Sequence, residues 1–399
     1  MSFIRTRLSV MMFLEFFIWG AWLPLFYGSL QERGFNASQI SWIFNTFAIA
    51  SFVGMFFSNQ FADRNFAAER FLAVSHLIGG LAFLGLLWAK SFWPFFALMM
   101  IHCLFYVPTI SITNSIAFAN VTDPRRDFGL VRLWGTIGWI AAAWPYIFFP
   151  DRTNMFYFTG GSSLLLAAFS LVLPHTPPRP AAAGESSFAW LEAAKLLKLP
   201  FVLVLFIVTF VDAMVHQGYF ILTETFLQKI GVAKNWTGTV MTVGQIAEIG
   251  TMAVLGIVLK QLGWRATMVI GIMGHTIRFA VFALFPYQVP VIASILLHGI
   301  CYAFFFATVY IFVDEFFPKD ARSSAQGLFN FLILGLGPFV GNILWPQLEA
   351  RSTTESQTDY FKLFLVPSLT ALAAAILLAL FFRPPAKAAG ESGQSAPAH

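Results

Sequence analysis

The chain contains few charged residues and almost no cysteine. Of its 399 residues, 11% are Asp, Glu, Lys or Arg, whereas a soluble domain carries about 25%, so the composition excludes an ordinary soluble protein. The only cysteines, Cys103 and Cys301, lie inside apolar runs. This excludes a disulfide framework or a cysteine metal site, and both are expected to be free thiols. The net charge of +5 is spread over short segments, which does not indicate nucleic-acid binding.

Long apolar runs make up most of the chain. Hydrophobic residues account for 58% of it, including 48 Phe. About 20 apolar residues cross a bilayer as a helix, and lipid requires every backbone polar group to be paired internally. The first run is too long for a cleavable signal and is expected to remain. The sequence predicts an all-α membrane protein with twelve transmembrane helices at about 6–30, 37–61, 69–89, 92–120, 129–149, 154–173, 200–228, 235–260, 265–286, 289–317, 322–348 and 360–382.

A segment rich in Pro and Ala divides these helices into two sets of six. Its prolines, beginning with Pro174, end the sixth helix, and 188–197 is expected to form a short amphipathic helix on the membrane surface. Lys and Arg are commoner on the side that holds both termini, which the positive-inside rule places in the cytoplasm. We predict an N-terminal half at 1–173, a cytoplasmic linker at 174–199, a C-terminal half at 200–383 and a disordered tail at 384–399.

Two six-helix sets around a basic linker resemble the layout of the major facilitator superfamily. In that fold two halves enclose a binding site near the bilayer midplane. The sequence Asp63-Arg64, followed by Arg70, is similar to the superfamily's Gly-x-x-x-Asp-Arg loop, with Asn59 in place of the glycine. The resemblance implies that these residues hold the halves together. The alternative is ordinary positive-inside charge.

A charge inside a membrane helix is costly and is therefore a functional hypothesis. Arg132 and Thr136 are one turn apart and share a helix face. With five donors, Arg132 could bind carbonyl or hydroxyl oxygens of a ligand. Alternatively, it could extend to the cytoplasmic headgroups. Gln245 and Glu248 also share a face and suit a neutral polar ligand. Their alternative is an interhelical salt bridge of Glu248 with Arg132 or Arg278.

Two carboxyl groups are candidates for carrying a proton. Burial raises the pKa of a carboxyl group toward neutrality, so Glu248 could be protonated and released during a cycle. Glu15 lies near the middle of the first helix, where an unpaired carboxylate would cost about 2.5 kcal/mol or more. It must be protonated, paired or in contact with water. A proton carrier and a structural partner are both open interpretations of Glu15.

Other polar residues in the predicted helices are weaker candidates. Asn114, Gln217, Tyr219 and Tyr302 could contact a ligand, although small polar groups in membranes more often join helices. Asp212 and His216 are an i, i+4 pair that could satisfy each other. Arg278 is expected to be structural, paired with Glu248 or Asp314, and Asp314 could order the loop after the tenth helix. No metal site, cofactor motif or nucleophile–base pair of an enzyme is present in the pattern, and a monomer is expected.

Several short segments together resemble one family, the bacterial nucleoside:proton symporters of the major facilitator superfamily. The resemblance is carried by residues 13–23, 106–109 with Asn114, 132–138, 245–248, 277–280 and 322–327. It implies that a nucleoside is recognised by Arg132, Thr136, Gln217, Gln245 and Glu248, with aromatic residues of the tenth helix near the base.

Three positions depart from the family's pattern. The first-helix polar residue, commonly Gln, is Glu15; an acid of the tenth helix associated with proton coupling falls at Ala303; and an expected Asn falls at Phe220 or its neighbour. Coupling is therefore expected at Glu15 or Glu248. We predict an inner-membrane secondary active transporter of nucleosides or a nucleoside-like small polar solute. The alternatives are a carrier for another solute, such as a sugar or drug, and an uncoupled facilitator.

Overall fold

The computed structural model describes residues 3–54, 65–178, 195–317, 322–354 and 357–384. This part of the chain is almost entirely helical, apart from one antiparallel pair of two-residue strands, β1 (Thr353–Thr354) and β2 (Gln357–Thr358). The helices, in chain order, are α1 (Phe3–Glu32), α2 (Ala37–Val53), α4 (Ala68–Gly85), α5 (Phe92–Asn120), α6 (Pro124–Ala142), η2 (Trp144–Ile147), α7 (Asn154–Ser170), η3 (Leu196–Lys198), α9 (Pro200–Lys229), α10 (Thr237–Leu284), α11 (Gln288–Ile295), α12 (Leu297–Cys301), η4 (Tyr302–Ala307), α13 (Thr308–Phe316), α14 (Arg322–Asn330), η5 (Phe331–Leu336), α15 (Gly337–Ser352) and α16 (Tyr360–Phe381).

The observed helices follow the predicted ranges with two kinds of difference. α10 runs through two predicted helices, and only Gly263, at φ 73° and ψ 174°, breaks its helical backbone. The predicted tenth and eleventh helices are each interrupted by a π-helical turn, η4 and η5. The Asp63-Arg64 loop, most of the linker with its amphipathic helix, and the tail from 385 lie outside the described residues.

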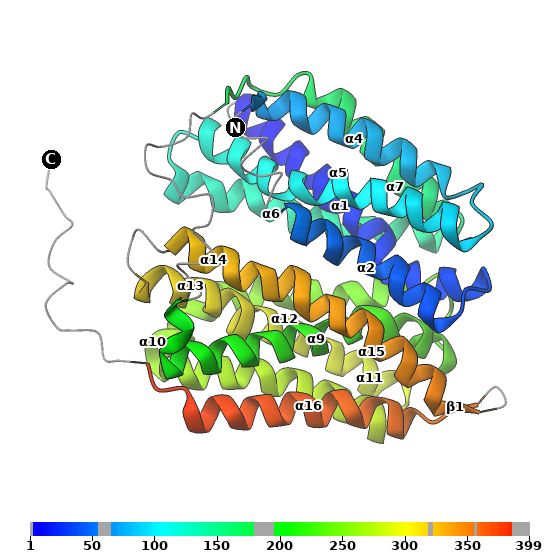
Figure 1. Ribbon diagram of the computed structural model, residues 1–399, viewed down its shortest axis with the longest axis vertical. Helices are drawn as coiled ribbons and strands as arrows, with labels where there is room; N and C mark the ends of the chain where they lie inside the picture. The colour runs from blue at the N-terminus through cyan, green and yellow to red at the C-terminus, as the bar shows by residue number, and fades with distance from the viewer. Residues whose placement is uncertain (1–2, 55–64, 179–194, 318–321, 355–356, 385–399) are drawn as a thin grey trace, which may run out of the picture.

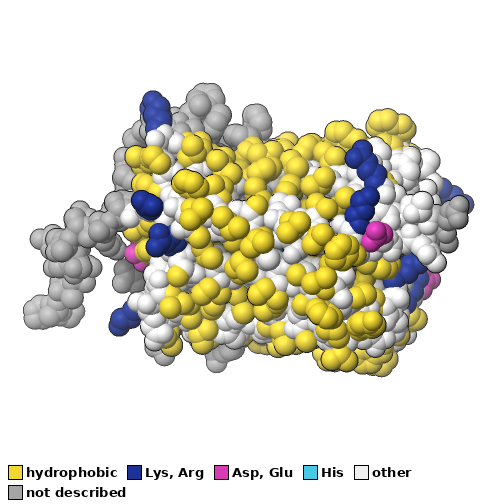
Figure 2. All heavy atoms as spheres, turned by 90° about the horizontal axis from the view of Figure 1, so that it is seen from below, with side chains coloured by type: hydrophobic (Ala, Val, Ile, Leu, Met, Phe, Trp, Pro, Cys, Tyr) yellow, Lys and Arg dark blue, Asp and Glu magenta, His cyan; other side chains and the backbone are white. Residues whose placement is uncertain are grey.

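Eight segments of the described chain are long and apolar enough to cross a membrane, which supports the predicted all-helical membrane class. They are α1, α4, α5, α9, α10, Gln288–Phe316, Ala325–Ser352 and α16. α2 is apolar but shorter, and α7 has 17 residues. α6 is more polar because it includes Arg125, Arg126, Asp127 and Arg132. Figure 2 shows a face whose middle is covered by hydrophobic side chains, with Lys and Arg toward its two ends, as expected of a surface in contact with lipid.

The helices lie in two groups (Figure 1). α1 to α7, the N-terminal group, are on one side, and α9 to α16, the C-terminal group, are on the other. The groups meet where α1 packs on α9 and α2 on α15. Two glycines permit close packing within the groups. A Cβ on Gly138 of α6 would collide with the carbonyl oxygen of Phe13 on α1, and one on Gly299 of α12 would collide with the backbone nitrogen of Glu248 on α10. These contacts fix the helices that carry Arg132 and Glu248.

Candidate substrate-binding site

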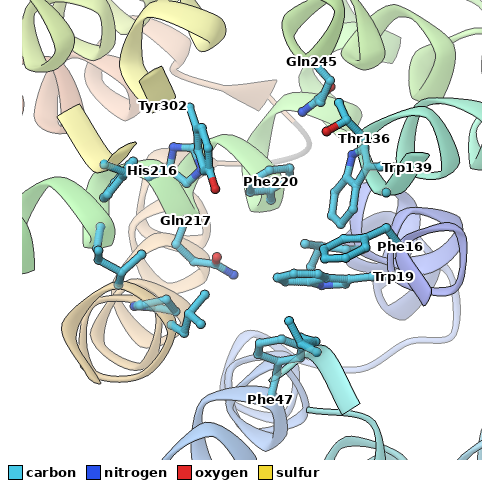
Figure 3. Close-up of a pocket in the computed structure, with 18 of the residues that line it drawn as sticks. Phe16, Trp19, Phe47, Thr136, Trp139, His216, Gln217, Phe220, Gln245 and Tyr302 are labelled. Atoms are coloured by element: carbon cyan, nitrogen blue, oxygen red, sulfur yellow. The ribbon is translucent and has the colours of Figure 1, made fainter. Parts of the chain in front are cut away.

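A cavity of about 270 Å³ lies between the two groups of helices. Its size is near the lower end of the range for small-molecule sites, about 300–1,000 Å³. Both groups contribute to its wall. In Figure 3 the labelled side chains surround a common space, with Phe16, Trp19, Phe47 and Trp139 on one side and His216 and Tyr302 on the other. A ligand in this space would contact both groups at once.

Aromatic rings from the N-terminal group form one wall of the cavity. Trp19 and Phe47 are stacked, with ring centroids 5.0 Å apart, and the edge of Trp139 meets Trp19 at 5.2 Å. Phe220 of α9 continues this wall, 6.1 Å from Trp139. Such rings offer flat apolar faces on which a planar ring can pack. The indole nitrogen of Trp19 is buried without a hydrogen-bond partner among the described residues.

Two opposite charges line the cavity, one from each group. The guanidinium of Arg132 on α6 lies 4.0 Å above the ring of Phe16. Glu248 of α10 interacts electrostatically with it, but no ion pair within 4.0 Å joins the two side chains. Of the two interpretations of Arg132, the structure therefore favours the cavity over the headgroups. Neither charge makes a side-chain hydrogen bond inside the described part of the protein, so both are available to a ligand.

Amides and hydroxyls complete the polar lining. Thr136 follows Arg132 on the cavity face of α6. The side-chain nitrogen of Gln217 donates to Asn342 Oδ1 at 2.7 Å, and Asn342 in turn donates to Asn45 of α2 at 3.0 Å. This chain of amides joins α9, α15 and α2, and so links the two groups. Gln245 Nε2 lies 3.3 Å from His298 Nε2.

The remaining predicted ligand contacts divide into two classes. Asn114 and Tyr302 line the cavity, and the side-chain oxygen of Asn114 is buried without a partner in the described chain. Tyr219 is fully buried beside His298, and its hydroxyl donates to the carbonyl of Met241 at 3.2 Å. Tyr219 therefore supports His298, which does line the cavity.

The predicted structural residues have different partners from those expected. Arg278 is fully buried and its Nη1 lies 3.1 Å from His298 Nδ1; this contact replaces the expected pairing with Glu248 or Asp314. Asp314 and Arg70 are both exposed. Ala303, at the position of the missing acid, is fully buried and packs with Leu255 and Phe304 rather than on the cavity.

Glu15 is fully buried inside the N-terminal group. Its Oε2 lies 2.9 Å from His76 Nε2, and its Oε1 accepts a hydrogen bond from Thr109 at 2.8 Å. The other ring nitrogen of His76 lies 3.0 Å from Ser163 Oγ. Both carboxylate oxygens of Glu15 are therefore partnered by residues of its own group.

Sequence reasoning missed Asn342, which carries the amide chain across the groups. A polar residue in an apolar helix was the available signal for it. Sequence reasoning counted His298 among the polar residues of the tenth helix but did not foresee that it joins Gln245 to Arg278. The turns η4 and η5 each place side chains on the cavity, including Tyr302 and Ile333. π-Helical turns are frequent at functional sites, but no residue pattern in the sequence predicted η4 or η5.

Ion pairs close one end of the interface between the groups. The buried Arg152, which precedes α7, pairs with Glu32 of α1 and with Glu224 of α9. Lys234 joins Glu32 at 2.7 Å. At the same end, Tyr27 of α1 donates to Glu349 of α15. These bonds connect α1 to α9 and α15, so they hold the two groups together on that side of the cavity.

Comparisons with known proteins agree with this geometry. The family model "Nucleoside H+ symporter" matches residues 1–387. The putative nucleoside transporter YegT of Escherichia coli K12 is 37% identical, over 84% of this chain and 82% of that protein. The xanthosine permease of the same organism is 28% identical, over 95% and 96%. The crystal structure of the nucleoside transporter NupG has the same fold, with a TM-score of 0.87, 24% identity and coverage of 96% and 100%. The chain belongs to the nucleoside H+ symporter family, whose members are transporters rather than enzymes.

Proposed function

We propose that this protein moves a nucleoside across the bacterial inner membrane together with protons, by alternating access. The proposed architecture is the twelve-helix fold of the major facilitator superfamily, with halves at 1–173 and 200–383 and both termini cytoplasmic. The eight apolar spans support it. One of them, α10, is long enough for two crossings, one before and one after Gly263, so the eight account for nine crossings. The shorter or more polar α2, α6 and α7 supply the remaining three.

The observation that carries this proposal is the pairing of an aromatic wall with polar groups from both halves in one cavity. A nucleoside has a planar base and a ribose with several hydroxyls. The rings of Trp19, Phe47 and Trp139 offer stacking faces. Arg132 can donate to carbonyl or hydroxyl oxygens, and Glu248 can accept from N–H or O–H groups. The amides of Gln217 and Gln245, the hydroxyl of Thr136, and the side chains of Asn114 and Tyr302 complete the proposed contacts.

The coupling carboxyl that we propose is Glu248. It lines the cavity opposite Arg132, and its carboxyl group has no hydrogen bond to the described residues, so its protonation would directly change what the ligand meets. Of the two open interpretations of Glu15, the structural one fits its surroundings better, because both oxygens are already bonded to His76 and Thr109.

The closed end of the interface is periplasmic in this proposal. The loop before α7, which holds Arg152, and the loop after α9, which holds Lys234, lie on the side opposite both termini if each span crosses the bilayer once. The structure then corresponds to a state closed to the periplasm, in which the ion pairs of Arg152 separate when the carrier opens outward.

Uptake by proteoliposomes tests the proposal. Radiolabelled uridine and adenosine would be supplied with and without an inward proton gradient, against empty liposomes and an Arg132→Ala variant of matched folding. Accumulation above equilibrium, dependent on the gradient, is expected. Equilibration without accumulation would reject proton coupling and leave a facilitator, consistent with Ala303. No uptake by folded protein would reject the nucleoside and direct the search to another polar solute.

A further inference from the structure

Three buried side chains of the C-terminal group form a hydrogen-bonded row that ends at the cavity. Asp212 and His216 lie one turn apart on α9, and His275 of α10 lies between them. Asp212 Oδ1 is 3.0 Å from His275 Nδ1, and His275 Nε2 is 3.1 Å from His216 Nδ1. The sequence suggested that Asp212 and His216 could satisfy each other directly, but a residue of another helix joins them instead.

Only the last member of this row contacts the cavity. Asp212 and His275 are fully buried, whereas His216 is partly exposed and lines the cavity beside Gln217. The second oxygen of Asp212 is buried without a hydrogen-bond partner in the part of the chain that the structure describes. That part contains no cluster of His, Cys, Asp and Glu placed to hold a metal ion. The row therefore leads from an incompletely satisfied carboxyl group to the space where a substrate would lie.

The hydrogen bonds fix where protons must reside along the row. If Asp212 is ionised, it accepts from the Nδ1–H of His275. The Nε2 of His275 is then bare, because a neutral imidazole carries one N–H, and it must accept from the Nδ1–H of His216. The Nε2 of His216 is consequently bare too. An imidazole nitrogen with a free lone pair is thus assigned to the one residue of the row that lines the cavity.

A buried positive charge lies close to the row. Arg278 acts electrostatically on Asp212 and on all three histidines of this region, and its Nε and Nη2 have no hydrogen-bond partner among the described residues. One buried carboxylate and one guanidinium balance each other while the row is deprotonated. A proton added to the row leaves one uncompensated positive charge. Whether the row keeps this proton therefore depends on what occupies the cavity beside His216.

The other groups that face the row come from α9, α10 and α12. His298 packs against His216 with ring centroids 5.0 Å apart and ring planes tilted by 31°, and the guanidinium of Arg278 lies 4.3 Å from the ring centroid of Tyr219. Cys301 of α12 interacts electrostatically with Asp212 and Arg278. From α15 and α16, which also pack on α9, the nearby polar side chains are Trp345, which donates to Met214, and Ser368, which donates to Thr276. Neither of these two titrates in the physiological range.

We propose that the Asp212–His275–His216 row is a proton-binding site of the transport cycle, additional to Glu248. A proton from the cavity binds the Nε2 of His216. The Nδ1 proton of His216 then passes to His275 Nε2, and the Nδ1 proton of His275 passes to Asp212, so that the added proton resides on the carboxyl group. The reverse sequence releases it to the cavity. The row would perform the task for which this chain has no acid at Ala303. This inference rests on the proposed nucleoside–proton symport.

Proton movement and substrate movement can be measured separately. Proteoliposomes containing a trapped pH indicator would receive uridine or adenosine without an imposed gradient, and counterflow of labelled nucleoside would be recorded in parallel. Wild-type protein should acidify the lumen as nucleoside enters. Asp212→Asn should lower the acidification per nucleoside transported below the wild-type value while counterflow persists, because Glu248 still carries its own proton. His102→Asn is the matched control, because His102 is an equally buried histidine whose one hydrogen bond within the described chain is with a backbone carbonyl, that of Gly79. Both signals should remain.

A second variant keeps the test decisive if Asp212→Asn does not fold. His275→Gln retains a side chain that can hydrogen-bond at both ends but cannot relay protons, and it should give the same separation of the two signals. Acidification at the wild-type level in either folded variant would overturn the proposal. If both folded variants lost counterflow as well as acidification, the proposal would also be overturned, because losing both signals indicates a structural role. Absence of both signals in wild-type protein would instead refute the proposed function.

Discussion

Among the described residues, each group of helices contains one carboxyl group bonded to a buried histidine, yet the two pairs end differently. In the N-terminal group, Glu15 and His76 lie 2.9 Å apart, and the row ends at the buried Ser163. In the C-terminal group, Asp212 and His275 lie 3.0 Å apart, and the row continues to His216. The separations are nearly equal, so distance does not distinguish the pairs.

The difference lies in saturation and access. Both oxygens of Glu15 have partners, whereas one oxygen of Asp212 has none in the described structure. The row of Asp212 ends at a residue that lines the cavity, so a proton has a route in and out. A buried acid–histidine pair can therefore hold helices together when it is closed, or carry a proton when its far end reaches water.

The largest expected effect follows from removing the carboxyl group of Glu15, which should destabilise the N-terminal group. Glu15→Ala should lower the free energy of unfolding by about 3–5 kcal/mol, because removing one member of a buried pair leaves its partners unsatisfied. Thr113→Val is a control, since the side chain of Thr113, in the part of the protein that the structure describes, bonds only carbonyls of its own helix. Thermal unfolding of the purified variants in one detergent would measure both.

The companion variant Glu15→Gln keeps hydrogen bonding but cannot ionise. It should retain gradient-driven uptake in proteoliposomes. If Glu15→Gln folds, shows counterflow and yet loses accumulation, Glu15 is a proton carrier after all, and the contrast between the two pairs is wrong.

The two charges of the cavity sharpen the comparison, because each group supplies one. Arg132→Ala should weaken nucleoside binding about ten- to hundredfold, since a hydrogen bond to a charged group contributes about 1.5–3 kcal/mol and each 1.4 kcal/mol is tenfold. Arg265→Ala, a change at an exposed arginine, should leave affinity unchanged. Calorimetric titration of folded protein with uridine would show this, and an unaltered affinity of Arg132→Ala would remove that residue from the site.

Glu248→Gln examines the other charge of the same cavity. It should abolish gradient-driven accumulation, because an amide cannot take up and release a proton, while the side chain still fills its place. Uptake with and without the gradient gives the answer, with Gln228→Ala at the closed end as a variant outside the cavity. Concentrative uptake by Glu248→Gln would end its assignment to coupling and leave the Asp212 row as the sole proposed proton site.

Much of the fold could be predicted from the sequence, because the length and polarity of apolar runs decide where helices can lie in lipid. The observed α1, α5 and α9 follow the predicted ranges closely. The continuity of α10 past Gly263 and the π-helical turns η4 and η5 could not be predicted, since they depend on how neighbouring helices pack.

The site shows the same division. Helical spacing and the family resemblance predicted Arg132, Thr136 and Glu248 as ligand contacts, because residues one turn apart share a face, and all three line the cavity. Spacing within one helix could not reveal that His275 joins Asp212 to His216, since this information belongs to the contact between α9 and α10. The sequence could therefore predict polar pairs within one membrane helix, but not the residue of a second helix that hydrogen-bonds to both members of a pair.

The closed end of the interface gives a smaller effect on a different property. Arg152→Ala leaves Glu224 buried without its cation, which should shift the population toward the state open at that end. Asn45→Cys, at the amide chain across the groups, would report this shift through faster reaction with a membrane-impermeant thiol reagent in intact cells. Cys103 and Cys301 are buried and should give little background. An unchanged rate would show that these ion pairs do not hold the interface closed.

The smallest expected effect is the loss of one hydroxyl from a buried tyrosine, and each group of helices offers one such residue. Tyr106 donates to the backbone carbonyl of Glu15 at 2.8 Å, and Tyr219 donates to that of Met241 at 3.2 Å. Each also packs against a histidine, His102 or His298. Replacing either tyrosine by Phe should lower the free energy of unfolding by only about 0.5–1.5 kcal/mol, the usual net contribution of one hydrogen bond.

Nucleoside affinity distinguishes support from contact for Tyr219. Neither Tyr106→Phe nor Tyr219→Phe should change the affinity for uridine, because both hydroxyls are bonded to backbone and both rings are fully buried. If Tyr219→Phe alone weakened binding more than threefold at equal stability, its hydroxyl would have to reach the ligand in another state of the cycle. The sequence-based assignment of Tyr219 to the substrate would then hold, and the wall of the C-terminal group would have to rearrange around His298 when the nucleoside binds.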